Sequence, residues 1–263
     1  MKIKPSAIST LLKLLALVSI TLCSRQTLAQ AAANTPTQAQ YTIGLGVASL
    51  PEFDGAKENE IRVLPIINIR YGRLTIGGIN GIGYEVANVK GVRFSATTGY
   101  FRGRNENDAL YLRGVGDIDS SITAGMAINK SFGPFRLGFK ANRDFSDDVG
   151  GLTASLSAGF SHRISQQLVV SIGTSLSWMN SNHAAGVYGI SNQQSLASNL
   201  PLFEAKSGLK NVGVSLVGLY FIDQHWSITT MLRQSALLGD AKASPISLGN
   251  SPYFVMSGFS YKF

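Results

Sequence analysis

Apolar and polar residues alternate along most of the chain after residue 40, and the last eleven residues show the pattern most clearly. One parity is aromatic or aliphatic: Tyr253, Val255, Phe259, Tyr261 and Phe263. The other parity is mostly small or polar: Met256, Gly258, Ser260 and Lys262. Successive side chains of a strand point to opposite faces, so this segment predicts a strand with one apolar face. Both a membrane barrel and a soluble β-sandwich contain such strands, and the sandwich is the alternative fold.

The same alternation predicts twelve strands and no long helix. Their expected ranges are 41–49, 60–71, 73–79, 81–87, 91–103, 118–131, 134–146, 150–163, 167–180, 208–222, 225–236 and 251–263. The polar parity of these strands is mainly Ser, Thr and Gly, whereas a soluble sandwich would present long charged side chains to water. Small polar residues suit the lumen of a barrel whose apolar parity faces lipid.

The lengths of the connections favour the barrel. Short connections follow the even-numbered strands, and the long ones follow odd-numbered strands at 50–59, 104–117, 181–207 and 237–250. In a bacterial outer-membrane barrel both termini lie in the periplasm, short turns are periplasmic and long loops are extracellular. We therefore expect an all-β, antiparallel, up-and-down transmembrane β-barrel of twelve strands over residues 41–263. Strands 73–79 and 81–87 are short for a membrane crossing, so we expect a bulged hairpin on one side of the wall.

Aromatic residues near the predicted strand ends support a membrane location. Interfacial girdles of aromatic residues occur at both rims of membrane barrels. The candidates are Tyr71, Tyr84, Tyr100, Phe101, Trp178, Tyr220, Phe221, Trp226 and Tyr261.

The N-terminus predicts export. Lys2 and Lys4 precede an apolar stretch at 11–20, and small residues around Ala29 and Ala31 suit cleavage, so residues 1–31 are expected to be a cleaved signal peptide. Residues 32–40 are expected to be a flexible tail. The only cysteine lies in the predicted signal, so the mature chain has no thiol for a disulfide or a metal.

Charge does not indicate a nucleic-acid partner. The formal net charge is +8, and four of its bases lie in the predicted signal, which leaves about +4. This excess is modest, and no basic stripe is interleaved with aromatic residues.

Several motifs resemble the MipA/OmpV family of outer-membrane proteins. They are the segments 188–191 and 197–200, the late loop 237–246 and the ending 258–263. The late loop carries the most specific part: Gly239, Asp240, Ser244 and Pro245. Near the start, Gly44-Leu45-Gly46 and the segment 51–56 fit the family's first strand and loop. Phe53 replaces a more usual Tyr there, and Lys242 stands where an acidic residue is commoner.

The resemblance implies a non-enzymatic scaffold of the bacterial cell outer membrane. Its expected partners are a murein-cleaving lytic transglycosylase and a penicillin-binding protein. Outer-membrane lipid, lipopolysaccharide and the barrel-assembly machinery are the other expected partners. At the family level the terminal aromatics, here Tyr261 and Phe263, are typical of the signal which that machinery recognises.

The sequence gives little evidence for a group of catalytic residues. Asp144, Asp147 and Asp148 with His183 would be the pieces of a barrel-mouth protease, but a solvated turn is the better explanation of these residues. Ser161 and His162 are adjacent in a strand and should point to opposite faces, which excludes a simple dyad. The three histidines show no metal spacing, and we expect no cofactor.

Charges on the polar parity are more informative. The candidate lumen-lining residues are Arg62, Arg70, Arg93, Arg136 and Lys140. Buried charges need partners or water, so either the lumen is wet or these bases pair with acids such as Glu85. A narrow diffusion channel for small, slightly anionic solutes is thus an alternative to the scaffold, unless the 181–207 loop plugs the lumen. An adhesin acting through its loops is a further alternative.

Bases of the predicted loops are candidates for contact with lipopolysaccharide phosphates, although they could equally be solvated. They are Lys57, Arg104, Lys206, Lys210 and Lys242.

Overall fold

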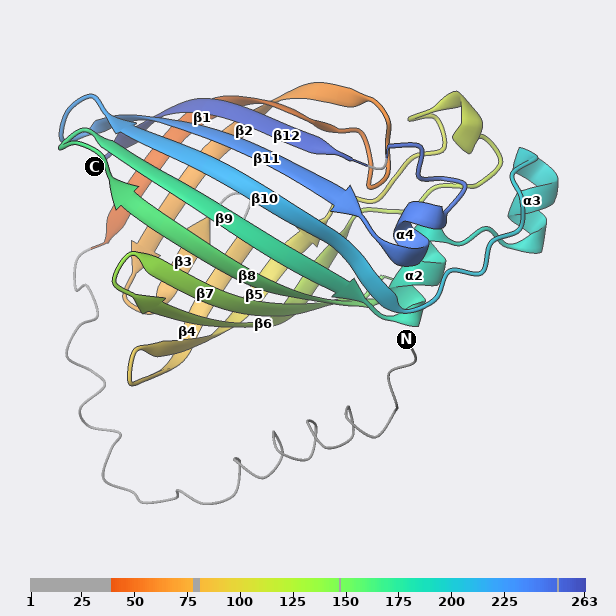
Figure 1. Ribbon diagram of the computed structural model, residues 1–263, viewed down its shortest axis with the longest axis horizontal. Helices are drawn as coiled ribbons and strands as arrows, with labels where there is room; N and C mark the ends of the chain where they lie inside the picture. The colour runs from red at the N-terminus through yellow and green to blue at the C-terminus, as the bar shows by residue number, and fades with distance from the viewer. Residues whose placement is uncertain (1–38, 78–80, 147, 250) are drawn as a thin grey trace, which may run out of the picture. The chain divides into compact units, whose positions relative to one another are not determined.

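The computed structural model describes residues 39–77, 81–146, 148–249 and 251–263. The predicted signal, 1–31, and all of the predicted tail except residues 39 and 40 lie outside the described residues. The described chain forms a closed antiparallel barrel of twelve strands, and β1 pairs with β12 (Figure 1). The predicted fold class is therefore confirmed.

The strands follow the predicted ranges closely. They are β1 Gln40–Pro51, β2 Asn59–Tyr71, β3 Leu74–Gly77, β4 Gly81–Val89, β5 Val92–Phe101, β6 Ser121–Phe132, β7 Phe135–Asp144, β8 Leu152–Arg163, β9 Leu168–Met179, β10 Gly208–Phe221, β11 Trp226–Leu237 and β12 Tyr253–Lys262. The expected short hairpin is present, since β3 has four residues and β4 has nine with a bulge between Glu85 and Ala87. The short turns and the C-terminus lie at one end of the barrel, which we call the turn end (Figure 1).

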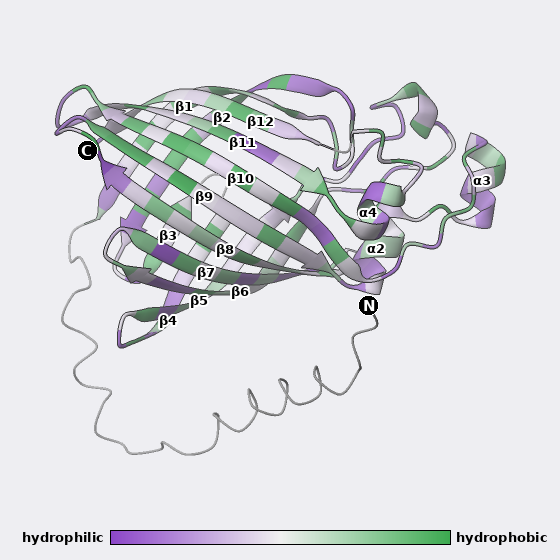
Figure 2. Ribbon diagram, in the orientation of Figure 1, coloured by the Kyte–Doolittle hydropathy of each residue, from purple (hydrophilic) through white to green (hydrophobic). Residues whose placement is uncertain are grey.

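The two faces of the wall divide by parity as the sequence predicts. On β12, Val255 and Phe259 are exposed, whereas Met256 and Ser260 are buried. Figure 2 shows the resulting alternation of hydrophobic and hydrophilic positions along the strands. Apolar side chains that point outward with no protein around them are expected where the surrounding medium is lipid.

The seam between β1 and β12 runs from the pair Thr42 and Lys262 to the pair Ser49 and Val255. Small residues line its inner side, including Gly44, Gly46 and Gly258. Without side chains there, the two strands approach closely and the last strand closes the barrel.

Short helices lie at the other end, which we call the loop end (Figure 1). They are η1 Leu110–Leu112, α2 Ser181–Tyr188, α3 Asn192–Ser198 and α4 Gly239–Ala243. Period-two alternation could not predict them, because each is at most eight residues long and two of them are held by side-chain caps at Asn180 and Ser191.

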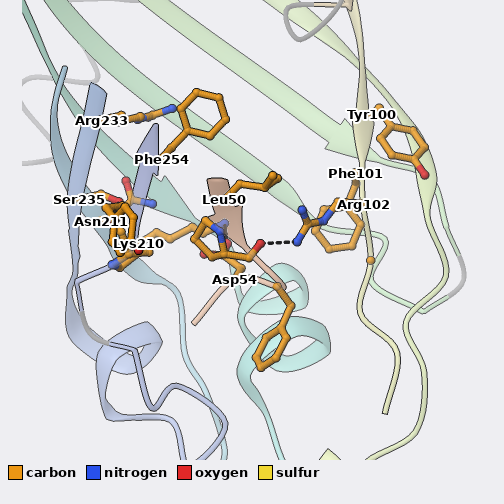
Figure 3. A pocket seen from close by; sticks show the side chains of 15 residues that line it. Leu50, Asp54, Tyr100, Phe101, Arg102, Lys210, Asn211, Arg233, Ser235 and Phe254 are labelled. Atoms are coloured by element: carbon orange, nitrogen blue, oxygen red, sulfur yellow. Dashed lines mark hydrogen bonds and ion pairs between the residues drawn. The ribbon is translucent and has the colours of Figure 1, made fainter. Parts of the chain in front are cut away.

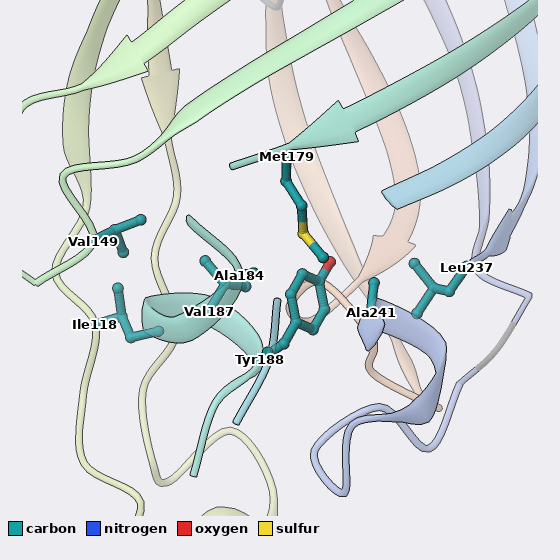
Figure 4. Close-up of a cluster of buried hydrophobic side chains, with 9 residues drawn as sticks. Ile118, Val149, Met179, Ala184, Val187, Tyr188, Leu237 and Ala241 are labelled. Atoms are coloured by element: carbon teal, nitrogen blue, oxygen red, sulfur yellow. The ribbon is translucent and has the colours of Figure 1, made fainter. Parts of the chain in front are cut away.

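Most buried apolar residues lie in the loops and not in the barrel. One cluster joins Ile118, Val149, Met179, Ala184, Val187, Tyr188, Ala205, Leu237 and Ala241 (Figure 4). A second cluster joins Phe53, Ala56, Leu112, Val115, Ile190 and Ile246. We call the loops that carry these clusters the plug: residues 52–58, 102–120, 180–207 and 238–249. The plug packs against inward-facing residues at the ends of β9 and β11, so it spans the mouth of the barrel.

Two aromatic residues do not belong to the predicted girdles. Phe101 packs against the first cluster, edge-on to His183 with ring centroids 6.0 Å apart. Phe221 has the inward parity of its strand and lies under Arg163, at 5.9 Å. Both were wrongly assigned because each directly follows an outward-facing tyrosine at a strand end. The outward tyrosines and tryptophans near the strand ends, such as Tyr71 and Trp226, are exposed as predicted.

Closure of the barrel should depend on Gly44. A Cβ added there would run into the backbone carbonyl oxygen of Phe259, and a backbone atom cannot move aside cheaply. We expect Gly44→Ala to destabilise the folded barrel by about 1–3 kcal/mol, which is typical of overpacking. The measurement is the temperature at which the heat-modifiable gel mobility is lost after refolding. Gly83→Ala is the control, since a Cβ at Gly83 meets nothing within 4 Å, and equal midpoints for the two variants would contradict the prediction.

Candidate functional site: the plugged mouth and the lumen beneath it

Three polar side chains from separate segments meet at the base of the plug. Asp54 follows β1, His183 lies in the first turn of α2, and Lys210 lies near the start of β10. The Lys210 Nζ atom lies 2.5 Å from Asp54 Oδ2 and 3.4 Å from His183 Nε2. One ammonium group therefore ties the first loop and the long helical loop to the barrel wall.

Local structure places each member of this cluster. The Asn180 side chain accepts hydrogen bonds from the backbone N–H groups of His183, at 3.0 Å, and of Leu152, at 2.9 Å. It thus caps α2 and fixes that helix to β8. The pairing of β10 with β9 shifts register between Leu209 and Asn211. Lys210 therefore does not follow the inward and outward alternation of the strand, and its side chain turns toward the mouth.

The charges in this cluster are set by burial and by each other. Burial alone would raise the pKa of Asp54, but the Lys210 ammonium lowers it below its ordinary value. Burial, and secondly the Lys210 charge, lower the pKa of His183 to about 4. His183 is therefore neutral at pH 7, and its Nε2 atom can accept a hydrogen bond from Lys210, which assigns the ring proton to Nδ1. Burial and the nearby Asp54 carboxylate raise the pKa of Tyr188, which stays a neutral phenol.

The late-loop motif holds the plug together. Gly239 has a positive φ of 51° and starts α4, and Asp240 Oδ2 accepts a hydrogen bond from the Lys206 backbone N–H at 2.7 Å. The Ser244 hydroxyl donates to the backbone carbonyl of Tyr188 at 2.6 Å, and half-buried Pro245 follows it. Figure 4 shows the Tyr188 ring between Ala184 of α2 and Ala241 of α4. These residues join the two helical loops and thereby stabilise the plug.

Two of the bases expected to meet lipopolysaccharide are turned inward instead. The Lys210 side chain is 13% exposed, and Arg104 is 7% exposed. Arg104 Nη1 donates to the backbone carbonyl of Val187 at 3.0 Å, which attaches the β5–β6 loop to α2. Lys57, Lys206 and Lys242 are exposed on the plug.

A cavity of about 360 Å³ lies where the plug meets the lumen (Figure 3). The neighbouring strands β10, β11, β12 and β1 line one side of it, and the end of β5 lines the other. Its walls carry Phe101, Phe254, Arg102, Arg233 and the Asp54–Lys210 pair. It is both apolar and basic, and its volume is in the range of small-molecule sites.

Strand register shows where the five predicted lumen bases lie. Arg62, Arg70, Arg93, Arg136 and Lys140 share the parity of the small and polar residues. Arg62 Nε lies 2.8 Å from Glu60 Oε2, and this is the one ion pair found for the five in the described chain. Sequence reasoning missed Arg233, although its parity with Ser227 and Ser235 could have revealed it.

The structure does not assemble the enzyme constellations. Asp144 accepts hydrogen bonds from the Ser121 hydroxyl and the Ser146 backbone N–H, both at 2.8 Å. Asp148 accepts from the backbone N–H of Asp119 at 2.9 Å, and Asp147 lies outside the described residues. Ser161 pairs with the Ser171 hydroxyl, while His162 stacks on Phe160 on the other face.

The described residues contain no group of three or more His, Cys, Asp or Glu side chains placed to hold a metal ion. Among the helices of the described ranges, none is long and apolar enough to cross a membrane.

Comparison with known proteins agrees with this architecture. The profile of the family described as "MltA-interacting protein MipA" matches residues 43–263. No curated protein sequence matches the chain significantly.

Solved structures with a similar fold are remote in sequence. The COG4313 outer membrane channel from Pseudomonas putida F1 is 11% identical, over 89% of this chain and 98% of its own, with a TM-score of 0.41. The anion-selective porin from Comamonas acidovorans is 11% identical, over 86% and 98%, with a TM-score of 0.40. The NanC porin is 10% identical, over 85% and 100%, with a TM-score of 0.44.

A closed barrel with an outward apolar belt, a polar lumen and loops packed across one mouth defines a bacterial outer-membrane β-barrel protein. Since the family profile covers nearly the whole barrel, the chain belongs to the MltA-interacting protein MipA family. The protein lies in the outer membrane, with the loop end outside the cell and the turn end in the periplasm.

The plug should loosen as the pH falls from about 6.5 to about 4. In the docked plug His183 remains neutral until pH about 4, whereas an undocked plug would let it protonate near its ordinary pKa of 6.5. A depressed histidine pKa stabilises the docked state at higher pH, and this stabilisation is lost on acidification, by roughly 3 kcal/mol in total. The stabilisation that the ionised Asp54 carboxylate gives to the docked plug would be lost only at still lower pH, below the lowered pKa of Asp54.

Hydrogen exchange of peptides from 181–207 at pH 7, 5 and 4 tests this expectation, after correction for intrinsic rates. Protection should decline in the wild type and in the control His225→Gln, whose histidine lies in a periplasmic turn. His183→Gln should largely remove the decline between pH 6.5 and 4. An unchanged decline in His183→Gln would show that another group is responsible.

Proposed function

We propose that this protein is a non-enzymatic scaffold of the outer membrane that docks a murein-cleaving lytic transglycosylase at its periplasmic face. The observation that carries the proposal is the plug, whose two apolar clusters span the extracellular mouth. A barrel blocked at this mouth is poorly suited to free diffusion of solutes. The family's description names an interaction with such an enzyme, which supports the same role here.

The periplasmic turns offer a specific docking surface. The turns after β8 and β10 are joined, because the Phe221 backbone N–H donates to the Gln167 carbonyl at 2.8 Å. The Tyr220 hydroxyl also donates to Gln167 Oε1, at 3.3 Å. We call residues 164–167 and 222–225 the periplasmic ledge. Ile164 is 59% exposed on it and Ile222 is 43% exposed, and apolar side chains presented among polar ones suit a protein partner.

Other partners belong to the same proposal. A penicillin-binding protein would be bridged through the bound transglycosylase. The assembly machinery would read Tyr261 and Phe263, whose rings pack edge-on at 4.9 Å at the turn end. Exposed Lys57, Lys206 and Lys242 would meet lipopolysaccharide phosphates.

The ledge should be required for docking. Ile164→Asp combined with Ile222→Asp places two charges where the partner would bury apolar surface, so retention of the transglycosylase on immobilised protein should fall by about tenfold or more. Leu196→Asp is the control, because Leu196 is 87% exposed on α3 at the extracellular end. All variants must keep heat-modifiable mobility. Equal retention by the ledge variant and the control would refute docking at this site.

A narrow anion channel is the second candidate, because the lumen contains more bases than acids.

Under the scaffold proposal, purified protein in planar bilayers should show no steady conductance steps at pH 7. Lys210→Met should produce brief openings, since it removes the ammonium that anchors Asp54 and His183. Lys206→Met, at an exposed position just before β10, is the control. Steady wild-type steps at pH 7 that shrink in Arg136→Glu would establish the channel instead.

A further inference from the structure

The barrel wall is incomplete on the extracellular side of the β3–β4 hairpin. β2 pairs with β3 only over residues 68–71, and in the described chain β5 pairs with β4 only as far as Thr97, although Gly81 also lies against the backbone of Thr98 and Gly99. β3 is four residues long and ends at Gly77, which pairs with Gly81, so the described part of the hairpin does not extend along the rest of β2. Residues 59–67 of β2 and 100–101 of β5 therefore border a gap, and in the described chain no pairing joins them. We call this gap the lateral opening.

Pro65 marks the free edge of β2. It pairs with Leu45 of β1 but has no N–H to donate, and proline in sheets is confined to edges. Peptide groups of a strand alternate between its two neighbours, so Ile61, Val63 and Ile67, which share the parity of Pro65, direct their peptide groups into the opening. Unsatisfied peptide groups in hydrocarbon are costly. The opening should therefore hold polar atoms supplied by water, a headgroup or another chain.

The side chains beside the opening lack neighbours on that flank. Ile61 is 78% exposed and Tyr100 is 69% exposed. Outward residues of the fully paired wall span a wide range of exposure, from 36% for Ile228 to 71% for Ile122. These residues carry the outward apolar parity, so the opening lies within the lipid-facing belt on its outer-leaflet side.

Arg102 bridges the extracellular edge of the opening. Its Nη1 atom lies 3.2 Å from Glu60 Oε1 of β2. Its Nη2 atom donates to the backbone carbonyl of Pro51 at 2.5 Å and also to that of Glu52. Figure 3 shows this side chain reaching from the end of β5 toward the end of β1. The opening is thus framed on three sides, with a cation on its rim.

The 360 Å³ cavity lies directly behind this frame, since Tyr100, Phe101 and Arg102 belong to its lining. The inner wall next to the opening is apolar. Leu64 and Ile66 have the inward parity of β2, and the small residues Gly46 and Gly258 lie opposite Leu64 across the seam. On the far side Arg233 lies among the cavity residues with Phe254. Leu64 and Ile66 lie farther along β2 than the cavity residues, so an apolar strand face leads away from a cavity that contains Arg233, and this combination suits an amphiphile.

Further bases lead from the cavity toward the periplasm. Lys140 and, nearer the turn end, Arg136 have inward parity on β7, and Arg70 has inward parity near the turn end of β2. An acidic headgroup would meet favourable charge along this wall, whereas a cationic one would be repelled.

We propose that the lateral opening admits an amphiphile with an acyl chain and an acidic headgroup from the outer leaflet into the cavity beneath the plug. The chain lies along Leu64 and Ile66, and the headgroup meets Arg233. This site goes beyond the scaffold role and does not depend on the periplasmic ledge.

Photocrosslinking from inside the barrel tests this site. A benzophenone amino acid replaces Leu64, the protein is folded into phosphatidylcholine vesicles containing alkyne-bearing palmitate, and attached alkyne is quantified after irradiation. The Leu64 probe should be labelled several-fold more than a probe at Ser161, which also has inward parity but lies on β8 toward the turn end. A probe at Ile172, outward on β9, reports bulk lipid. Every protein must show heat-modifiable mobility.

The headgroup is tested with Arg233→Gln. Loss of one charge-assisted contact should lower palmitate labelling at Leu64 about tenfold, while labelling at Ile172 and labelling by an alkyne-bearing alcohol stay unchanged. An alkyne-bearing phosphatidylglycerol in place of palmitate distinguishes a phospholipid source from a free fatty acid. Labelling at Leu64 no higher than at Ser161, or crosslinking of two chains through the Leu64 probe, would overturn the proposal. Equal effects of Arg233→Gln on acid and alcohol would overturn the assignment of an acidic ligand.

Discussion

The structure depends on the need to pair every backbone N–H and C=O group that lies in lipid. A sheet that closes on itself meets this need, and closure at the β1–β12 seam requires the small inward residues around Gly44. Once the wall is closed, the apolar parity must face lipid, and the ordinary location of a hydrophobic core is reversed. The barrel keeps small and charged residues inside, and the buried apolar residues collect in the loops.

The plug is therefore the part of this protein that most resembles a water-soluble domain. Its clusters bury residues such as Tyr188 and Ile246 completely, above a lumen in which inward residues such as Ser157 remain exposed. The Asp54–Lys210–His183 cluster lies at the boundary between these two environments. One ammonium there serves a carboxylate and a neutral imidazole, so the attachment carries no uncompensated buried acid and weakens first when His183 gains a proton.

The wall could be predicted from the sequence because it rests on local periodicity, which one strand displays by itself. The alternation ending at Phe263 and the distribution of short and long connections were sufficient for strand number and face. The plug could not be predicted in this way. Its contacts join residues as distant as Asp54 and Lys210, Lys210 lies at a register shift that breaks the alternation, and its helices depend on caps such as Asn180. The resemblance in the late loop pointed to Ser244 without revealing that its hydroxyl binds the Tyr188 carbonyl.

The short β3–β4 hairpin leaves part of the wall unpaired. The position of this gap determines which surroundings the lumen meets. If the hairpin were extended, the barrel would be closed at its mouth by the plug and along its side by strands, and the basic lumen would communicate with the periplasm alone. With the opening beside Pro65, the cavity beneath the plug borders the outer leaflet instead, while the plug covers the mouth. Arg102 fixes this arrangement, because one guanidinium joins the ends of β1, β2 and β5 above the gap. Plug, opening and basic lumen then form one site: the plug covers the mouth, the opening faces the membrane, and Arg233 supplies the charge that the proposed acidic amphiphile would meet.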